Sequence, residues 1–262
     1  MEPSYLADAI VRLTRAFPDL TLRTSYVSAV LTTTPLETLA KALDRLCARA
    51  EQAEEPAREA LLSVVDALGS AGAQEVAQRL REEAVGESLW SLERLVRQAP
   101  SVRAAPEIDP SEQRIPDYVK GRPLTLGERK SLARRPDRNT IDKLLQDPHP
   151  DVIRCLLKNP RLTEDDVVRL SARRPGRPDV LAEIARTPHW LHRSRVRLAL
   201  MLNPDTPTEL AAPISGLLVR QELRLVAEAT HVSPHVRALC MEYLERRPPG
   251  EKASPSRGDP VQ

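Results

Sequence analysis

The sequence contains two histidine pairs whose residue type and spacing could do chemistry. His189 and His192 stand three positions apart, and His231 and His235 stand four apart. On one continuous helix either spacing would put both imidazole groups on the same face, where they could bind a metal ion. A proline beside each pair, however, marks an expected helix start, and no carboxylate or thiol stands at a matching distance. We therefore expect structural roles for these histidines and no metal site.

Motifs for nucleotide binding and hydrolysis are missing from the sequence. Gly69 and Gly72 form a close glycine pair, but the lysine and hydroxyl residue of a phosphate-binding loop do not follow. Neither Gly-x-Ser-x-Gly nor His-Glu-x-x-His occurs. Cys47, Cys155 and Cys240 lie far apart in helical patterns, which indicates buried, reduced thiols of a cytoplasmic protein. The sequence therefore predicts no enzymatic activity and no cofactor.

Arginine is the chemically active residue type with the clearest pattern. Two Arg-Arg pairs each stand directly before a proline, 39 residues apart, and further arginines follow a tryptophan in the next segment. Guanidinium groups suit carboxylate or phosphate partners. They also stabilise helix C-termini and form salt bridges within a protein, so a structural and a partner-binding interpretation both stay open. The residues that we predict to bind a partner are Arg134, Arg135, Arg173, Arg174, Trp190, Arg193 and Arg197.

These arginines belong to a stretch, residues 125–244, that repeats itself. Leu-Ala-Arg-Arg-Pro ending at Pro136 recurs as Ser-Ala-Arg-Arg-Pro ending at Pro175, and Asn159 before a proline recurs as Asn203. A period near 40 residues predicts a repeat architecture, in which each unit buries its apolar face against its neighbours. Each asparagine should end a helix and bond backbone groups of the adjoining turn.

Apolar spacing, prolines and capping residues predict an all-α fold. We expect four regions: an N-terminal helical bundle at 1–98, a proline-rich linker at 99–116, an α-helical repeat domain at 117–247 and a disordered tail at 248–262. In the bundle, the expected helices are 4–17, 22–31, 35–52, 56–69, 73–84 and 88–98. In the repeat domain, they are 126–134, 138–146, 150–158, 163–173, 178–186, 192–202, 207–219, 220–229 and 234–246.

Charge divides the chain more than its net charge of +2 suggests. Residues 1–120 carry 14 basic and 19 acidic side chains, whereas residues 121–247 carry 23 basic and 16 acidic ones. An acidic and a basic half can serve different partners or attract each other, although ordinary solvated helix faces would also give this pattern. The sequence lacks a signal peptide and an apolar run of membrane-spanning length, so we expect no membrane association.

The repeated stretch resembles the bacterial leucine-rich repeat variant and, more loosely, HEAT-like α-solenoids. The shared features are an Asp-Pro turn at Asp147, a helix that opens on Val-x-Arg at Val152, an Asn-Pro turn at Asn159, and then a helix rich in leucine and valine. The resemblance covers about residues 125–245 and implies a solenoid with a concave surface for proteins, sometimes for nucleic acid. The founding proteins of that repeat family carry an N-terminal iron–sulfur segment with clustered cysteines. Cys47 stands alone here, so no cluster is expected.

The resemblance and the absence of catalytic motifs favour a non-enzymatic helical-repeat scaffold or adaptor that binds a protein partner through the solenoid surface. The alternative is a HEAT-like protein that binds nucleic acid, which includes the DNA-glycosylase type. Base stacking or a flipped-base pocket normally needs several aromatic side chains. The expected repeat domain at 117–247 holds only Tyr118, Trp190 and Tyr243, which argues against the alternative.

Overall fold

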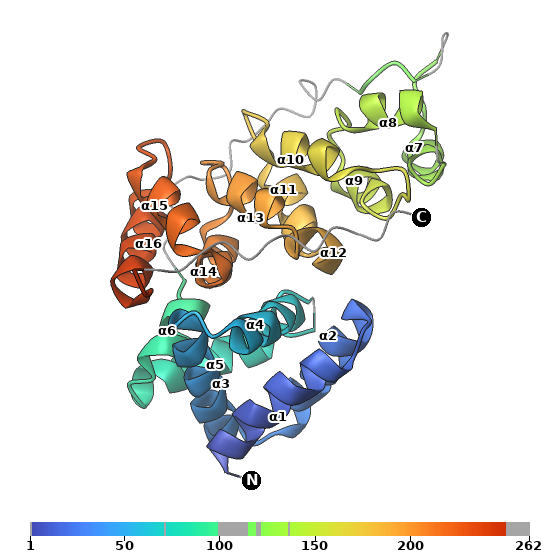
Figure 1. Ribbon diagram of the computed structural model, residues 1–262. Coiled ribbons are helices and arrows are strands. Elements are labelled where there is room, and N and C mark those ends of the chain that lie inside the picture. Colours follow the sequence, from blue (N-terminus) through green and yellow to red (C-terminus); the bar gives the residue numbers. More distant parts are fainter. Residues whose placement is uncertain (1, 71, 99–114, 119–121, 136, 250–262) are drawn as a thin grey trace. The chain divides into compact units, whose positions relative to one another are not determined.

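The computed structural model is helical throughout the residues that it describes, which are 2–70, 72–98, 115–118, 122–135 and 137–249 (Figure 1). These residues form sixteen helices and no strand, which confirms the all-α fold class. None of their helices is long and apolar enough to cross a membrane. The expected linker at 99–116 lies outside the described residues except for its last two positions, and the expected tail lies outside them from residue 250 onward.

The contacts divide the chain into two units, and each is described by itself. Unit 1 comprises residues 1–100 and 208–262, and unit 2 comprises residues 101–207. The helices of unit 1 are α1 Pro3–Ala16, α2 Leu20–Thr33, α3 Leu36–Glu51, α4 Glu55–Leu68, α5 Gln74–Gly86, α6 Trp90–Val96, α14 Thr208–Leu217, α15 Arg220–Glu228 and α16 Pro234–Arg246. The helices of unit 2 are α7 Leu126–Ala133, α8 Arg138–Leu144, α9 Pro150–Leu156, α10 Glu164–Ala172, α11 Pro178–Ala185, α12 Pro188–Leu191 and α13 Ser194–Met201.

The division differs from the predicted repeat domain at 117–247, because α14 packs against α4 and α6 of the N-terminal region. Arg247 is buried, and its guanidinium donates hydrogen bonds to the carbonyl oxygens of Ala50, Gly216 and Leu218. The apolar pattern of α16 resembles that of earlier repeats, but a helix pattern does not specify which helix covers it. Contacts to residues some 200 positions earlier therefore could not be read from the repeat period.

A buried ion pair is built into the core of unit 1. Arg94 on α6 donates to Glu51 at the end of α3 through Nε at 2.9 Å and Nη2 at 2.8 Å. Both side chains are almost fully buried, and Ser91 supplies a further hydroxyl contact to each. Breaking such a pair leaves an uncompensated buried charge and is strongly destabilising, so this pair holds α3 and α6 together.

In unit 2 the sequence repeat is matched by two equivalent sets of hydrogen bonds. Asn159, after α9, donates from Nδ2 to the carbonyl oxygens of Ala133 and Arg135 at the end of α7, both at 2.8 Å. Asn203, after α13, donates in the same way to Ser171 at 2.7 Å and Arg173 at 3.0 Å, at the end of α10. The two asparagines are buried and satisfy carbonyl groups that a helix end leaves without partners. They join α7 to α9 and α10 to α13, which are also the helix pairs that pack together.

Candidate functional site

The structure places the two Arg-Arg pairs at equivalent helix ends. Arg134 and Arg135 follow the last turn of α7, and Arg173 and Arg174 follow α10. All four residues are exposed, and Arg174 donates to the carbonyl oxygen of Leu202 at 2.8 Å. Their exposure leaves them accessible to a partner, and their predicted role in binding one stays a prediction.

Trp190 and Arg197 lie elsewhere than predicted. Trp190 is 4% exposed, and its Nε1 donates to the carbonyl oxygen of Leu157 at 2.8 Å. Arg197 is 8% exposed and donates to the carbonyl oxygen of Leu191 at 2.8 Å. Both side chains serve the interior of unit 2, so we withdraw them from the predicted partner-binding set. Arg193 is half-buried at the start of α13.

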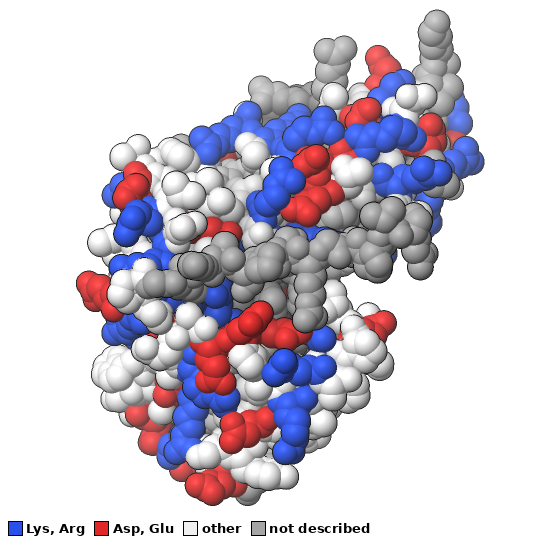
Figure 2. Space-filling view, viewed as in Figure 1, with Lys and Arg blue, Asp and Glu red and all other residues white. Residues whose placement is uncertain are grey.

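Four cations in unit 2 line a hollow between α7 and α9, which we call the basic hollow. Its volume is about 430 Å³. Figure 2 shows that lysine and arginine side chains are numerous over the helices of unit 2, with acidic side chains among them. The lining residues from α7 stand four positions apart, and those from α9 stand three, four and seven positions apart. Each set therefore lies on one face of its helix. The lining residues are Lys130, Arg134, Asp151, Arg154, Cys155 and Lys158.

The charges of the basic hollow are only partly balanced. Asp151 accepts from Lys130 at 3.4 Å and from Arg154 at 2.8 Å. Partial burial raises the pKa of Asp151, but these two cations outweigh it and hold the pKa below its ordinary value. Arg154 also donates to Glu183 at 2.6 Å and 2.8 Å, and this contact raises the pKa of Arg154. The carboxylates in contact with the hollow are therefore occupied by Lys130 and Arg154.

Two further cations of the hollow have no such partner. Arg134 and Lys158 are exposed, and within the described part of the chain neither side chain forms a hydrogen bond or an ion pair. The four cations of the hollow face two carboxylates, those of Asp151 and Glu183, which leaves a net charge of +2. An anion could therefore bind here without displacing an existing ion pair.

The repeat supplies an internal control for the basic hollow. If Asn159 and Asn203 are aligned, 44 residues apart, then Arg154 and Lys158 correspond to Leu198 and Leu202. The α10–α13 pair thus has leucine where the α7–α9 pair has exposed cations. Because the packing tolerates leucine at the position of Lys158, the fold does not require a charge there, whereas Arg154 pairs with Glu183.

The three cysteines only partly follow the prediction. Cys47 and Cys240 are buried free thiols, and burial raises the pKa of Cys240 to about 12. Cys155 is half-buried and lines the basic hollow. No group of three potential metal ligands occurs among the residues that the structure describes.

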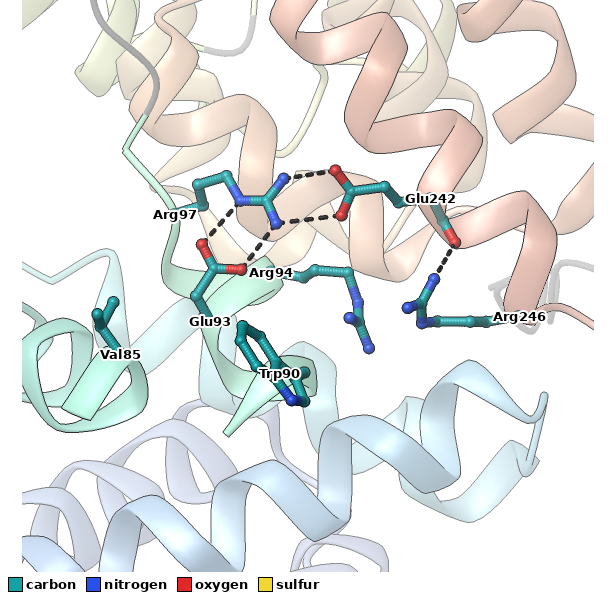
Figure 3. Close-up of a pocket in the computed structure, with 7 residues that line it drawn as sticks. All are labelled: Val85, Trp90, Glu93, Arg94, Arg97, Glu242 and Arg246. Carbon is teal, nitrogen blue, oxygen red and sulfur yellow. Dashed lines mark hydrogen bonds and ion pairs between the residues drawn. The ribbon is translucent and has the colours of Figure 1, made fainter. Parts of the chain in front are cut away.

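A second hollow lies in unit 1 and was missed by sequence reasoning. Its volume is about 620 Å³, and it is lined by Val85, Trp90, Glu93, Arg94, Arg97, Glu242 and Arg246 (Figure 3). These residues come from α5, α6 and α16, so α16 meets α6 across about 145 positions of sequence. One signal was available: Trp90 stands off the apolar face of its helix, which is formed by Leu92, Leu95 and Val96.

Comparisons with protein-family models, with curated proteins and with solved structures found no match for this chain.

Proposed function

We propose that this chain is a non-enzymatic scaffold or adaptor of the helical-repeat type, and that the basic hollow binds an acidic segment of a partner protein. The observation that carries the proposal is the pair of exposed cations, Arg134 and Lys158, beside a hollow that already holds Lys130 and Arg154. The repeat supports it for Lys158, because the corresponding residue after α13 is Leu202. A cation that the packing does not need is available for recognition.

The chemistry of the hollow fits carboxylates better than a single bulky anion. Arg134 can bind a carboxylate through two parallel N–H groups, and Lys158 adds a point charge one helix away. A single exposed ion pair contributes only about 0.2–1 kcal/mol. Affinity therefore requires several carboxylates in succession, as an acidic stretch of protein supplies, and it should fall as salt rises.

Nucleic acid is the second candidate, since a net positive surface also attracts phosphates. One observation counts against it. Tyr118 and Trp190 are the aromatic residues of unit 2, and both direct their polar atoms to internal partners, Asp147 and the Leu157 carbonyl. Stacked or flipped bases need accessible rings.

Fluorescence anisotropy tests the proposal with the full chain. The probes are a labelled glutamate-rich peptide, the same peptide with glutamine in place of glutamate, and single-stranded DNA. We expect the acidic peptide to bind and Arg134→Glu with Lys158→Glu to weaken its binding by about 10-fold or more. Arg79→Glu with Arg224→Glu is the matched control, because both arginines are exposed in unit 1. An equal loss in both variants, or tighter binding of DNA, would overturn the proposal.

A further inference from the structure

Two large apolar side chains border the hollow of unit 1. Trp90 is 64% exposed and Val85 is 65% exposed, and both belong to its lining. A single exposed apolar residue is ordinary on a protein surface. Here an indole ring and an aliphatic group share the wall of one hollow, which suits an apolar group of a ligand.

The polar wall beside Trp90 carries a donor that the fold leaves unused. The side chain of Arg94 is only 5% exposed, and Glu51 takes its Nε and Nη2. Within the described residues Nη1 has no hydrogen bond, and it is not sealed from solvent. Nη1 therefore reaches the hollow, and in Figure 3 the guanidinium of Arg94 lies between Trp90 and Arg246.

Arg246 makes this end of the hollow positive. Its Nε lies 3.9 Å from Oε2 of Glu51, the same carboxylate that Arg94 engages, and it also donates to the carbonyl oxygen of Glu242 at 2.9 Å. One carboxylate therefore faces two guanidinium groups, Arg94 and Arg246. Since Arg94 is held rigidly by its buried pair, its free donor is fixed in place for an incoming anion.

The opposite end of the hollow has the reverse polarity. Arg97 donates to Glu93 at 2.7 Å and 2.9 Å and to Glu242 at 2.7 Å and 3.1 Å. Two carboxylates here share one guanidinium, as Figure 3 shows. The hollow thus offers a positive end, a negative end and an apolar wall, within a volume of about 620 Å³.

We propose that this hollow binds the C-terminal residue of a partner polypeptide. Its α-carboxylate would bind Arg94 Nη1 and Arg246, and its apolar side chain would pack on Trp90 and Val85. A chain end joins a carboxylate and an apolar side chain at one carbon atom, which internal aspartate and glutamate residues do not. The backbone N–H groups of the partner polypeptide that precede its C-terminal residue would extend the contact to the carboxylates at the other end of the hollow. A small organic acid cannot reach those carboxylates.

The indole N–H signals in an NMR titration test this proposal directly. The full chain holds two tryptophans, and Trp190 is an internal reference because its N–H is bonded to the Leu157 carbonyl. The probe is acetyl-Gly-Leu with a free carboxylate, compared with acetyl-Gly-Leu-amide and with 4-methylpentanoate. We expect the free acid to shift the Trp90 signal saturably with a Kd of about 1 mM, and the amide and the small acid to bind at least about 5-fold more weakly.

Variants separate the site from the fold. Arg246→Gln should weaken the dipeptide at least about 5-fold, because it removes the half-exposed cation and spares the buried pair. Arg224→Gln, in the same unit, should leave binding unchanged. Equal binding of the acid and its amide, tighter binding of 4-methylpentanoate, or no shift of the Trp90 signal would each overturn the proposal.

Discussion

Replacing Asn159 with alanine should destabilise unit 2 strongly, although the residue lies outside every helix. The change removes two donor contacts, to Ala133 and Arg135 at 2.8 Å each, and one acceptor contact, from the Arg161 N–H at 3.0 Å. A hydrogen bond contributes about 0.5–1.5 kcal/mol net, and buried groups left without partners cost more. Three such contacts give an expected loss of about 2–4 kcal/mol in the free energy of unfolding.

Trp190 fluorescence during urea unfolding is the assay for this change. In a Trp90→Phe background, Trp190 is the only tryptophan and reports on unit 2, because its indole is buried against Leu157. Asn139→Ala is the matched control: Asn139 is exposed on α8 and its side chain makes no hydrogen bond to any described residue. It should change the free energy by less than about 0.5 kcal/mol.

The second joint extends the test. Asn203→Ala removes the equivalent three contacts, two to the end of α10 and one from the Asp205 N–H, so its cost should match that of Asn159→Ala. The two sites share no partner, so the double variant should lose the sum of the single losses to within about 0.5 kcal/mol. A loss at Asn159 no larger than that at Asn139 would refute the reasoning that these asparagines hold the helix pairs together.

Three further predictions follow from buried groups. Leu156→Ala and Leu200→Ala, both fully buried, should each cost about 2–5 kcal/mol by urea unfolding, and a loss below about 1 kcal/mol would contradict their place in the core. Arg138 holds the pKa of Asp166 well below its ordinary value, against the opposing effect of burial. The stabilisation by the ionised carboxylate is complete above about pH 4 and is lost as pH falls through the lowered pKa. The loss of unfolding free energy in Asp166→Asn should therefore shrink in acid, and a loss that does not change with pH would refute this role of Asp166. Arg247→Met leaves three carbonyl groups without their donor, so hydrogen exchange should rise in unit 1 and not in unit 2, and an even rise would contradict the division.

Helix positions could be predicted because their signals are local. The last helix was expected at 234–246 and is observed at Pro234–Arg246, since a proline sets its start and apolar spacing fills its length. Asn159 and Asn203 were expected to bond backbone groups beside their own turns, and each accepts from the backbone N–H two residues on. Each also donates to carbonyl groups 24 to 32 residues earlier. Those contacts were not predicted, because they depend on the repeat bringing earlier helix ends alongside.

The candidate sites were harder to predict because they depend on which side chains face one another. Trp190 was expected at a binding surface but is buried. An indole ring is apolar enough to pack in the interior, so the residue type alone did not distinguish the two positions. Arg134 was expected and lines the basic hollow, whereas Lys158 was not expected, although it follows α9, the helix that packs against α7. In unit 1, Trp90 and Arg246 line one hollow only because α16 lies beside α6, and no local pattern encodes that arrangement.

A charge-swap measurement tests most directly whether the basic hollow binds an acidic partner. The full chain and the variant Arg134→Glu with Lys158→Glu are each titrated by anisotropy with a glutamate-rich peptide and with its lysine-rich counterpart. If the hollow is the site, the wild type prefers the acidic peptide and the variant prefers the basic one, with both preferences weakening as salt rises. If the variant still binds the acidic peptide as tightly as the wild type does, the hollow between α7 and α9 is not where this protein holds its partner.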